Sequence, residues 1–337
     1  MNKMSWAAAA FAAAAIASAA GPACAQTNII VTAMSPAGSP FSNEFFRPWA
    51  DKIAADAKGA LTLDVRDGFA VANFGNVYDR VMNDVVQLGW AMQGLIGGQF
   101  PLTEVATFPF EADSSEQASV ALWRLYQSGQ LAREYANVKP LALGTYPMNG
   151  LHYAKAPATL DNLNGLKLRA ASKPQGDWIS HLGGTPITLN PEELYGAMQR
   201  GVVDATLQAW SAFGPLKLAD VTTHHLDVRF GTSTIMLFMS PQKYASLPDA
   251  ARKAIDDNAG EGRSRAWGQF IDANADKQGK MVLATPGHTR LELSPAQLAS
   301  WRQRVAPVAD AWKKAQPDGE AIFARYRATL ADVKAGK

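Results

Sequence analysis

Arg169 is the residue of this 337-residue chain whose chemistry is the most specific. It lies in the segment GLKLRA at positions 165–170, where apolar and basic residues alternate as in a strand with one buried face. A guanidinium can hold a carboxylate through two parallel hydrogen bonds, which lysine cannot reproduce. Since ligands of open α/β sheets bind beyond the carboxyl ends of strands, we predict that Arg169 binds an acid. A surface or interdomain ion pair is the alternative.

Four further residues could complete such a site. A charge-assisted hydrogen bond contributes only about 1.5–3 kcal/mol, whereas a micromolar ligand needs roughly 8 kcal/mol in all. The remainder must come from buried surface, which the rings of Trp90 and Trp210 can supply, although each also fits an ordinary core position. The amide of Gln208 can donate to a carboxylate, and His152 is a weaker, pH-dependent donor.

Weaker predictions extend the ligand-binding set to other parts of the chain. Met92, Gln93 and Phe238 are expected to line the pocket, and Phe238 fits the core at least as well. The loop at 35–39 offers hydroxyls and backbone amides, beginning with Ser35.

The sequence contains no recognisable catalytic or cofactor motif. It lacks HExxH, GxSxG, a P-loop and CxxC. The segment GEGRSR at 260–265 misses the dinucleotide-binding pattern at its last position and follows a helix. The histidines at 224–225 have no third ligand at metal spacing, and Asp204 fits a structural hydrogen bond at a strand end. We therefore predict no catalytic residue, no cofactor and no metal, with an enzyme as the alternative.

Alternating strands and helices position these residues. Apolar alternation predicts strands near 28–34, 61–65, 87–92, 142–146, 165–170, 202–207, 229–240 and 288–293. Apolar residues at helical spacing predict helices at 45–59, 77–85, 114–138, 190–201 and 248–281, and C-terminal helices from 294 onward. This order predicts an α/β fold with helices covering a parallel sheet.

The fourth predicted helix has the clearest limits. Asn190 is a candidate N-cap, Pro191 fits the first helical position, and Glu193 sits where a capping-box carboxylate reaches back. Gly201 is a natural stop, after which residues 202–207 form a short buried strand.

Three motifs follow one another closely. They are GLKLR at 165–169, GxxP at 183–186 and ExxYxAMQxGVVD at 192–204. Their order and spacing resemble the signature of the DctP-type substrate-binding proteins of TRAP transporters. The resemblance covers nearly the whole mature chain, although only residues 165–204 are specific. It implies a two-lobe, type II-like periplasmic binding protein with a central ligand cleft, long helices linking the lobes, and a strand arginine, here Arg169, that pairs with the ligand's carboxylate.

The chain is expected to cross between the two lobes. Residues 26–149 plus about 229–275 would form lobe I, and residues 150–228 plus about 276–337 would form lobe II. Ligand pockets favour such interfaces, and a hinge motion that closes one lobe on the other would bury the ligand.

Two positions depart from the dicarboxylate- and sialic-acid-type members of that family. Where these commonly have Glu-Asn-Pro, this chain has Leu207, Gln208 and Ala209. Where many have a second arginine after an Asn-Gly-x step, it has His152. Because a second fixed cation is missing, we predict a monocarboxylate with an apolar or aromatic body. A dicarboxylate is the alternative within the family.

The first 25 residues are typical of a cleavable signal peptide. Lys3 supplies a positive charge, residues 7–20 are apolar but short for a membrane span, and residues 23–25 form an A-x-A cleavage site. Lipid attachment at Cys24 is the alternative. Cleavage would remove the only cysteine, and no later segment is apolar enough to span a bilayer. We therefore predict a periplasmic protein without membrane insertion after cleavage.

The net charge and the family resemblance together limit the classes of partner that the protein can have. The net charge is +2, so removal of Lys3 leaves +1, and interspersed charges disfavour nucleic acid as a partner. The resemblance implies a TRAP membrane permease driven by an ion gradient, without an ATP-binding module. We predict that the protein captures an organic acid anion and delivers it unchanged to this permease. The alternatives are an enzyme on the same scaffold and a sensory partner that presents the ligand to a receptor.

Overall fold

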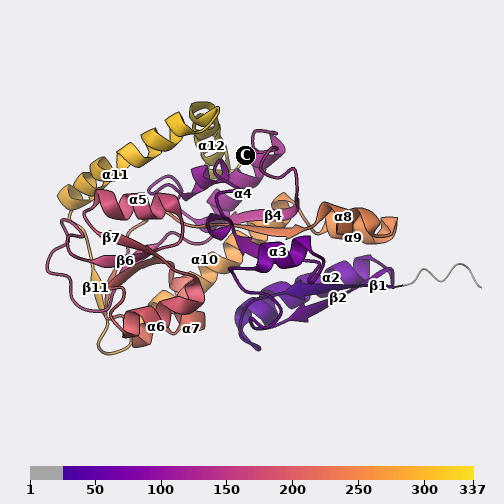
Figure 1. Ribbon diagram of the computed structural model, residues 1–337, viewed down its shortest axis with the longest axis horizontal. Helices are drawn as coiled ribbons and strands as arrows, with labels where there is room; N and C mark the ends of the chain where they lie inside the picture. Colours follow the sequence, from indigo (N-terminus) through magenta and orange to yellow (C-terminus); the bar gives the residue numbers. More distant parts are fainter. Residues whose placement is uncertain (1–25) are drawn as a thin grey trace, which may run out of the picture.

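The computed structural model describes residues 26–337, which contain a two-stranded, a three-stranded and a six-stranded β-sheet. An isolated bridge joins the two smaller sheets into one unit, here called the first sheet, which lies beside the six-stranded second sheet (Figure 1). The predicted signal peptide and Cys24 lie outside the described residues.

The first sheet is built mainly from the N-terminal part of the chain. Its strands are β1 (Thr27–Thr32), β2 (Leu61–Arg66), β3 (Gly89–Met92), β4 (Lys139–Thr145) and β10 (Thr234–Met239). β1 pairs in parallel with β2, and an isolated bridge between Val31 and Leu88 joins β1 to the start of β3. β10 lies between β3 and β4, antiparallel to both, and all six of its residues are buried.

The second sheet has six strands in the order β11-β9-β5-β8-β6-β7. They are β5 (Gly150–Tyr153), β6 (Lys167–Ala170), β7 (Thr185–Thr188), β8 (Ala205–Gln208), β9 (His224–Leu226) and β11 (Thr289–Leu291). β6 runs parallel to both of its neighbours, so that Arg169 lies in register with Ile187 of β7 and Thr206 of β8.

Helices cover both sheets and link them. The α-helices are α2 (Arg47–Asp56), α3 (Val77–Met82), α4 (Ser115–Gln127), α5 (Lys173–His181), α6 (Leu194–Gln199), α7 (Phe213–Leu216), α8 (Pro241–Ser246), α9 (Asp249–Asp257), α10 (Glu261–Leu283), α11 (Pro295–Ala315) and α12 (Gly319–Lys334). Shorter π or 3₁₀ segments are η2 (Phe41–Phe46), η3 (Gln93–Leu95), η4 (Thr103–Thr107), η5 (Pro191–Glu193), η6 (Trp210–Ala212) and η7 (Leu218–Asp220). α11 contacts α5, and α12 packs on α4 (Figure 1).

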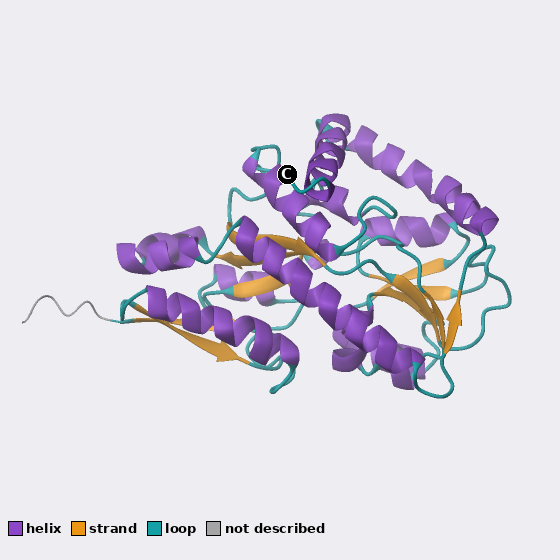
Figure 2. Cartoon of the chain, turned by 180° about the vertical axis from the view of Figure 1, so that it is seen from behind, coloured by secondary structure: helices purple, strands orange, loops and turns teal. Residues whose placement is uncertain are grey.

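The 23-residue helix α10 connects the two halves of the molecule; it is the long helix that crosses the view in Figure 2. Near its start it packs on α4 and β4, where the indole of Trp267 donates a hydrogen bond of 2.9 Å to the carbonyl of Thr145. Further along, Gly279 faces the ring of Trp210 in η6, beside the second sheet. The predicted two-lobe α/β architecture with long linking helices is therefore confirmed.

The prediction of parallel sheets is wrong for two strands. β10 runs antiparallel to its neighbours in the first sheet, and β5 runs antiparallel to β8 and β9 in the second. These are the first strands that the chain forms after it passes from one sheet to the other, and each enters its sheet from the opposite end.

Several element boundaries also differ from the prediction. Residues 173–188, for which no element was predicted, form α5 and β7, and the strand predicted at 202–207 begins only at Ala205. The helix predicted at 114–138 ends at Gln127. The helix predicted at 248–281 is two helices, because Gly260 between them adopts a φ of 83°, which favours glycine.

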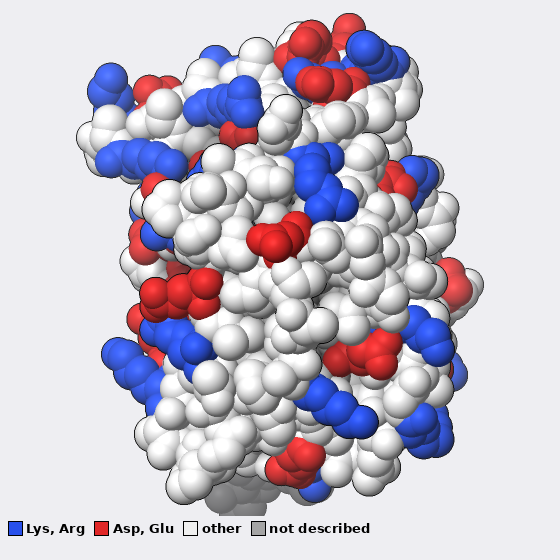
Figure 3. All heavy atoms as spheres, turned by 90° about the vertical axis from the view of Figure 1, so that its left-hand side faces the viewer, with Lys and Arg blue, Asp and Glu red and all other residues white. Residues whose placement is uncertain are grey.

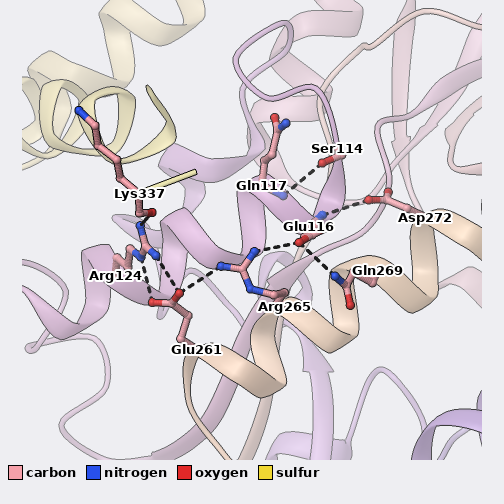
Figure 4. A network of polar contacts seen from close by, with 9 residues as sticks. All are labelled: Ser114, Glu116, Gln117, Arg124, Glu261, Arg265, Gln269, Asp272 and Lys337. Carbon is pink, nitrogen blue, oxygen red and sulfur yellow. Dashed lines mark hydrogen bonds and ion pairs between the residues drawn. The ribbon is translucent and has the colours of Figure 1, made fainter. Parts of the chain in front are cut away.

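A polar network joins α4 to α10 (Figure 4). Arg124 of α4 makes a two-pronged contact with Glu261, with N–O distances of 2.9 and 2.8 Å. The carboxylate of Asp272 accepts hydrogen bonds from the backbone N–H groups of Ser115 and Glu116 at the start of α4. Asp272 thereby fixes the first turn of α4 against the middle of α10, whereas Arg124 and Glu261 join the last turn of α4 to the start of α10.

Gly268 lets the two helices approach closely at this place. A Cβ at position 268 would overlap the backbone of Ser115 and Glu116, so Gly268→Ala is expected to lower the free energy of unfolding by about 1–3 kcal/mol. Gly262→Ala is the matched control on the same helix, because nothing lies within 4 Å of the added carbon. Urea unfolding followed by circular dichroism measures both, and equal destabilisation by the two variants would contradict the prediction.

Candidate functional site

A cavity of about 370 Å³ lies between the two sheets and α10. Its wall includes the loop at 34–41, the last residue of β8 with several residues of the segment 209–216 after it, and the middle of α10. No lysine, arginine, aspartate or glutamate lines it among residues 26–337. The cavity is therefore polar only through neutral groups.

Aromatic rings form one side of the cavity. The ring of Trp90 lies 5.3 Å from that of Phe41, 4.9 Å from that of Phe74 and 6.2 Å from that of Tyr146, measured between centroids. Phe69, 38% exposed, packs on Phe74 at the edge of this group. Trp90 is held in place because its indole N–H donates to the carbonyl of Ala33. This side offers a fixed apolar surface for a flat ligand.

Arg169 lies directly behind the cavity wall and is completely buried. Its Nη1 donates to the side-chain oxygen of Gln208 at 3.3 Å, and its Nε donates to the carbonyl of Leu189 at 3.1 Å. Its Nη2 has no partner in the described part of the protein, and no carboxylate of that part lies within ion-pair distance. Burial lowers the pKa of Arg169 to about 10, against the opposing influence of Tyr146 and Glu192.

A capped helix start at residues 190–193 lies next to Arg169, so two of the sequence motifs, at 165–169 and 192–204, act on the same guanidinium. The carboxylate of Glu193 accepts a hydrogen bond of 2.9 Å from the backbone N–H of Asn190, as a capping box requires, and Pro191 opens η5. This turn fixes the preceding residue, Leu189, whose carbonyl orients the guanidinium. The predicted cap is confirmed, and α6 ends at Gln199, just before Gly201.

Gln208 connects Arg169 to the cavity. It is the last residue of β8 and lines the cavity, while its side-chain oxygen accepts from Arg169. Its backbone carbonyl lies 3.0 Å from Nε2 of His152. A group that enters the cavity therefore meets Gln208 before it meets the guanidinium.

Polar side chains cross the second sheet in one row, because Arg169, Thr206, His152 and His225 are mutually in register. His152 shares the face of Arg169, as an acid-binding role would need. However, the rings of Trp210 and Phe213 cover it edge-on, each with its centroid 4.6 Å away. His152 therefore lies outside the cavity lining, and Trp210 packs over the sheet.

Three histidines form a hydrogen-bonded chain behind Gln208. Nδ1 of His152 lies 3.0 Å from Nδ1 of His225, whose Nε2 lies 2.9 Å from Nδ1 of His288. The carbonyl of Gln208 can only accept, so His152 carries its hydrogen on Nε2, and each following histidine donates from Nδ1. Burial lowers the pKa of His152 to about 3 and that of His225 to about 4, so all three rings are neutral at pH 7.

The structure brings some of the predicted ligand-binding residues together and separates others. Gln208, Trp90, Met92 and Ser35 line the cavity, and Arg169 lies behind Gln208. The remaining predicted residues, His152, Trp210, Gln93 and Phe238, are not among the lining residues.

The positions of Gln93 and Phe238 have simple packing reasons. The amide of Gln93 donates a hydrogen bond of 2.6 Å to the hydroxyl of Tyr135 and so points into the core of the first half. Phe238 of β10 is fully buried and stacks on Tyr78.

Most of the other lining residues were not predicted from the sequence. The aromatic ones are Phe41, Phe69, Phe74 and Tyr146, and the polar ones include Asn149, Ser233, Ser211, Asn274 and Gln278. Asn149 could have been found, since it belongs to the Asn-Gly step before His152. Asn274 and Gln278 share a helix face with Ile271, a signal that spacing alone provides.

Neither a membrane span nor a metal site is found in residues 26–337. No helix there is long and apolar enough to cross a membrane, and no group of three metal-ligating side chains is close enough together to hold a metal ion. On the face shown in Figure 3, basic and acidic side chains are interspersed without a large area of one sign.

Solved structures share this fold over nearly their whole length. A TRAP solute-binding protein from Rhodoferax ferrireducens T118, in complex with copurified benzoate, superposes with a TM-score of 0.87 at 22% identity, covering 93% of this chain and 100% of the other. A marine metagenome TRAP solute-binding protein specific for aromatic acid ligands, in complex with 3-hydroxybenzoate, gives 0.85 at 25% identity, covering 91% and 98%.

Sequence comparison leads to the same group. The outer membrane transporter protein TsaT of Comamonas testosteroni is 25% identical over 296 residues, which are 86% of this chain and 87% of the relative. The model of the DctP family, described as bacterial extracellular solute-binding protein, family 7, matches residues 31–315. The chain therefore belongs to the DctP family, the solute-binding proteins of TRAP transporters.

Proposed function

We propose that this protein is the periplasmic receptor of a TRAP transporter and binds a monocarboxylate with an aromatic or apolar body, which Arg169 holds by its carboxylate. One observation carries the proposal. A buried guanidinium without a counter-charge lies behind a cavity whose lining has no charged residue in the described part of the chain.

The electrostatics of Arg169 favour an anionic ligand. Burying a cation without a partner costs several kcal/mol, and an anion brought into hydrogen-bond contact offsets part of this cost. Nη2 is unpartnered, and Nη1 bonds only the neutral amide of Gln208. A carboxylate that displaces the Gln208 side chain could take both positions. A second carboxylate would find no second cation among the described residues of the wall, which disfavours a dicarboxylate.

The aromatic side of the cavity supports a flat apolar ligand body. The rings of Phe41, Phe74, Trp90 and Tyr146 provide contact area that a short dicarboxylate would leave unused. The relative that binds 3-hydroxybenzoate supports the same class of ligand.

We further propose how the receptor works. Residues 26–149 plus about 229–275 act as lobe I, and residues 150–228 plus about 276–337 act as lobe II. Their closure around the cavity buries the ligand and presents it to the permease. The N-terminal signal peptide directs the protein to the periplasm, and the ligand leaves chemically unchanged.

Isothermal titration calorimetry on refolded, ligand-free protein tests the proposal. Benzoate or cyclohexanecarboxylate is expected to bind with a Kd in the micromolar range, equivalent to roughly 8 kcal/mol, and succinate at least tenfold more weakly. Tight binding of succinate or malate without any response to monocarboxylates would overturn the proposed ligand class. Recovery of a chemically altered ligand after incubation would favour the enzyme alternative.

A further inference from the structure

We propose that the ligand also carries a neutral hydrogen-bonding group, such as a hydroxyl or a primary amide, and that Asn274, Gln278 and Ser211 recognise it. This inference rests on the proposed function, since it describes a second contact of the same ligand. It makes the three residues determinants of specificity that are separate from the carboxylate-binding arginine.

Helix α10 presents one stripe to the cavity. Ile271, Asn274 and Gln278 follow one another at steps of three and four residues, and all three line the cavity. The helix packs on η6, which carries Ser211. Two side-chain amides of α10 and one hydroxyl of η6 are thereby gathered at the cavity, and none of the three is hydrogen-bonded to Arg169.

These polar groups lack the partners that buried groups normally have. The side-chain oxygen of Asn274 and the hydroxyl of Ser211 are both buried without a hydrogen bond to any described residue. Leaving such a group unsatisfied destabilises the folded protein, because the group loses its hydrogen bonds to water without replacement. Most buried polar atoms in folded proteins are paired, so unpaired ones on residues that line the cavity point to a partner that arrives with the ligand.

The chemistry of the three residues defines the group that they can bind. Side-chain amides and hydroxyls both donate and accept, and an amide can turn over to exchange the two roles. They are neutral, so they do not supply the cation that a second carboxylate would need. A ligand hydroxyl or amide, which also donates and accepts, matches them best.

Matched ligand pairs provide the test. Benzoates with a hydroxyl or a carboxamide at the 2, 3 or 4 position are titrated into refolded protein, each beside the benzoate with a methyl group at the same position. At one position at least, the polar compound is expected to bind tenfold or more tightly than its methyl counterpart. Asn274→Leu, which keeps the size of the side chain, is expected to remove this preference.

Two further variants control for misfolding and for nonspecific effects of the substitution. Ser211→Ala is a second, milder variant and is expected to reduce the preference at least threefold. Gln269→Leu makes the same kind of change on α10 beside Glu116, away from the cavity lining, and is expected to keep the preference.

The outcomes separate this inference from the proposed function. If methyl and polar benzoates bind equally well at every position, the inference is wrong and the carboxylate site stands. If the preference exists but survives in both Asn274→Leu and Ser211→Ala, these residues do not recognise the polar group. If no benzoate binds at all, the proposed function itself fails, and this inference with it.

Discussion

Arg169→Lys is expected to weaken the binding of an aromatic monocarboxylate at least tenfold and to leave the fold intact. Lysine keeps the positive charge but loses the planar fork that holds two carboxylate oxygens at once. It also loses one of the donors that now bond Leu189 and Gln208, so the charge is positioned less firmly. Calorimetry with benzoate measures the loss, and the melting temperature of the ligand-free variant shows whether it folds.

Arg263→Lys is the matched control for this prediction. Arg263 of α10 is another arginine without an ion pair in the described residues. It is half-buried and stacks on the rings of Phe45 and Trp49, with Cζ-to-centroid distances of 3.6 and 4.3 Å. It does not line the ligand cavity, so its replacement should leave the affinity for benzoate unchanged. Unchanged affinity in Arg169→Lys, or an equal loss in both variants, would show that Arg169 does not hold the carboxylate.

The histidine chain is expected to make the protein less stable in acid. The pKa of His152 is lowered to about 3 and that of His225 to about 4, whereas both are near 6.5 in an unfolded chain. The unfolded state therefore binds more protons below pH 6.5, and the stability that the neutral histidines contribute is complete above that pH. It is lost progressively as the pH falls toward 3. We expect the contribution of each of these two histidines to the free energy of unfolding to decrease by on the order of 3 kcal/mol between pH 7 and pH 4.

Comparison with His152→Gln isolates this effect. Glutamine can still donate to the carbonyl of Gln208 but does not titrate, so the variant should lose less stability in acid than the unchanged protein. Buried carboxylates act in the opposite direction: burial raises the pKa of Glu104 to about 7 and that of Asp272 to about 6. Their contributions cancel when urea unfolding of the two proteins is compared at each pH. Parallel curves from pH 7 to pH 4 would contradict the prediction.

Local sequence signals located the strand of Arg169 and the helix start beside it. Both depend on short-range rules, namely alternation over six residues and a capping box over four, and the structure has both. The cavity wall depends instead on segments that are distant in sequence, such as Phe41, Trp90 and Tyr146. Since nothing in the sequence near any of these residues encodes their contact, the aromatic side could not be assembled from the sequence.

His152 shows what the sequence could not predict, namely which side chains pack on a given face of a sheet. Its departure from the family pattern was identified, although no strand was predicted at 150–153, and its side chain does share a sheet face with Arg169. However, the chain after β8 folds back, and Trp210 and Phe213 cover the imidazole. Periodicity predicts which way a strand residue faces, but it does not predict what packs on that face.

The depth of the Arg169 guanidinium also has a consequence for how dissolved salt affects the receptor. Mobile ions weaken attractions between charges that they can surround, with a screening length of about 8 Å at physiological ionic strength. They cannot surround a fully buried cation behind a wall without charged groups. The affinity for the acid should therefore be similar at low and at high ionic strength. Because the cation is buried, it creates no strong electrostatic field outside the protein. The anion therefore reaches the opening of the cavity by diffusion without electrostatic steering.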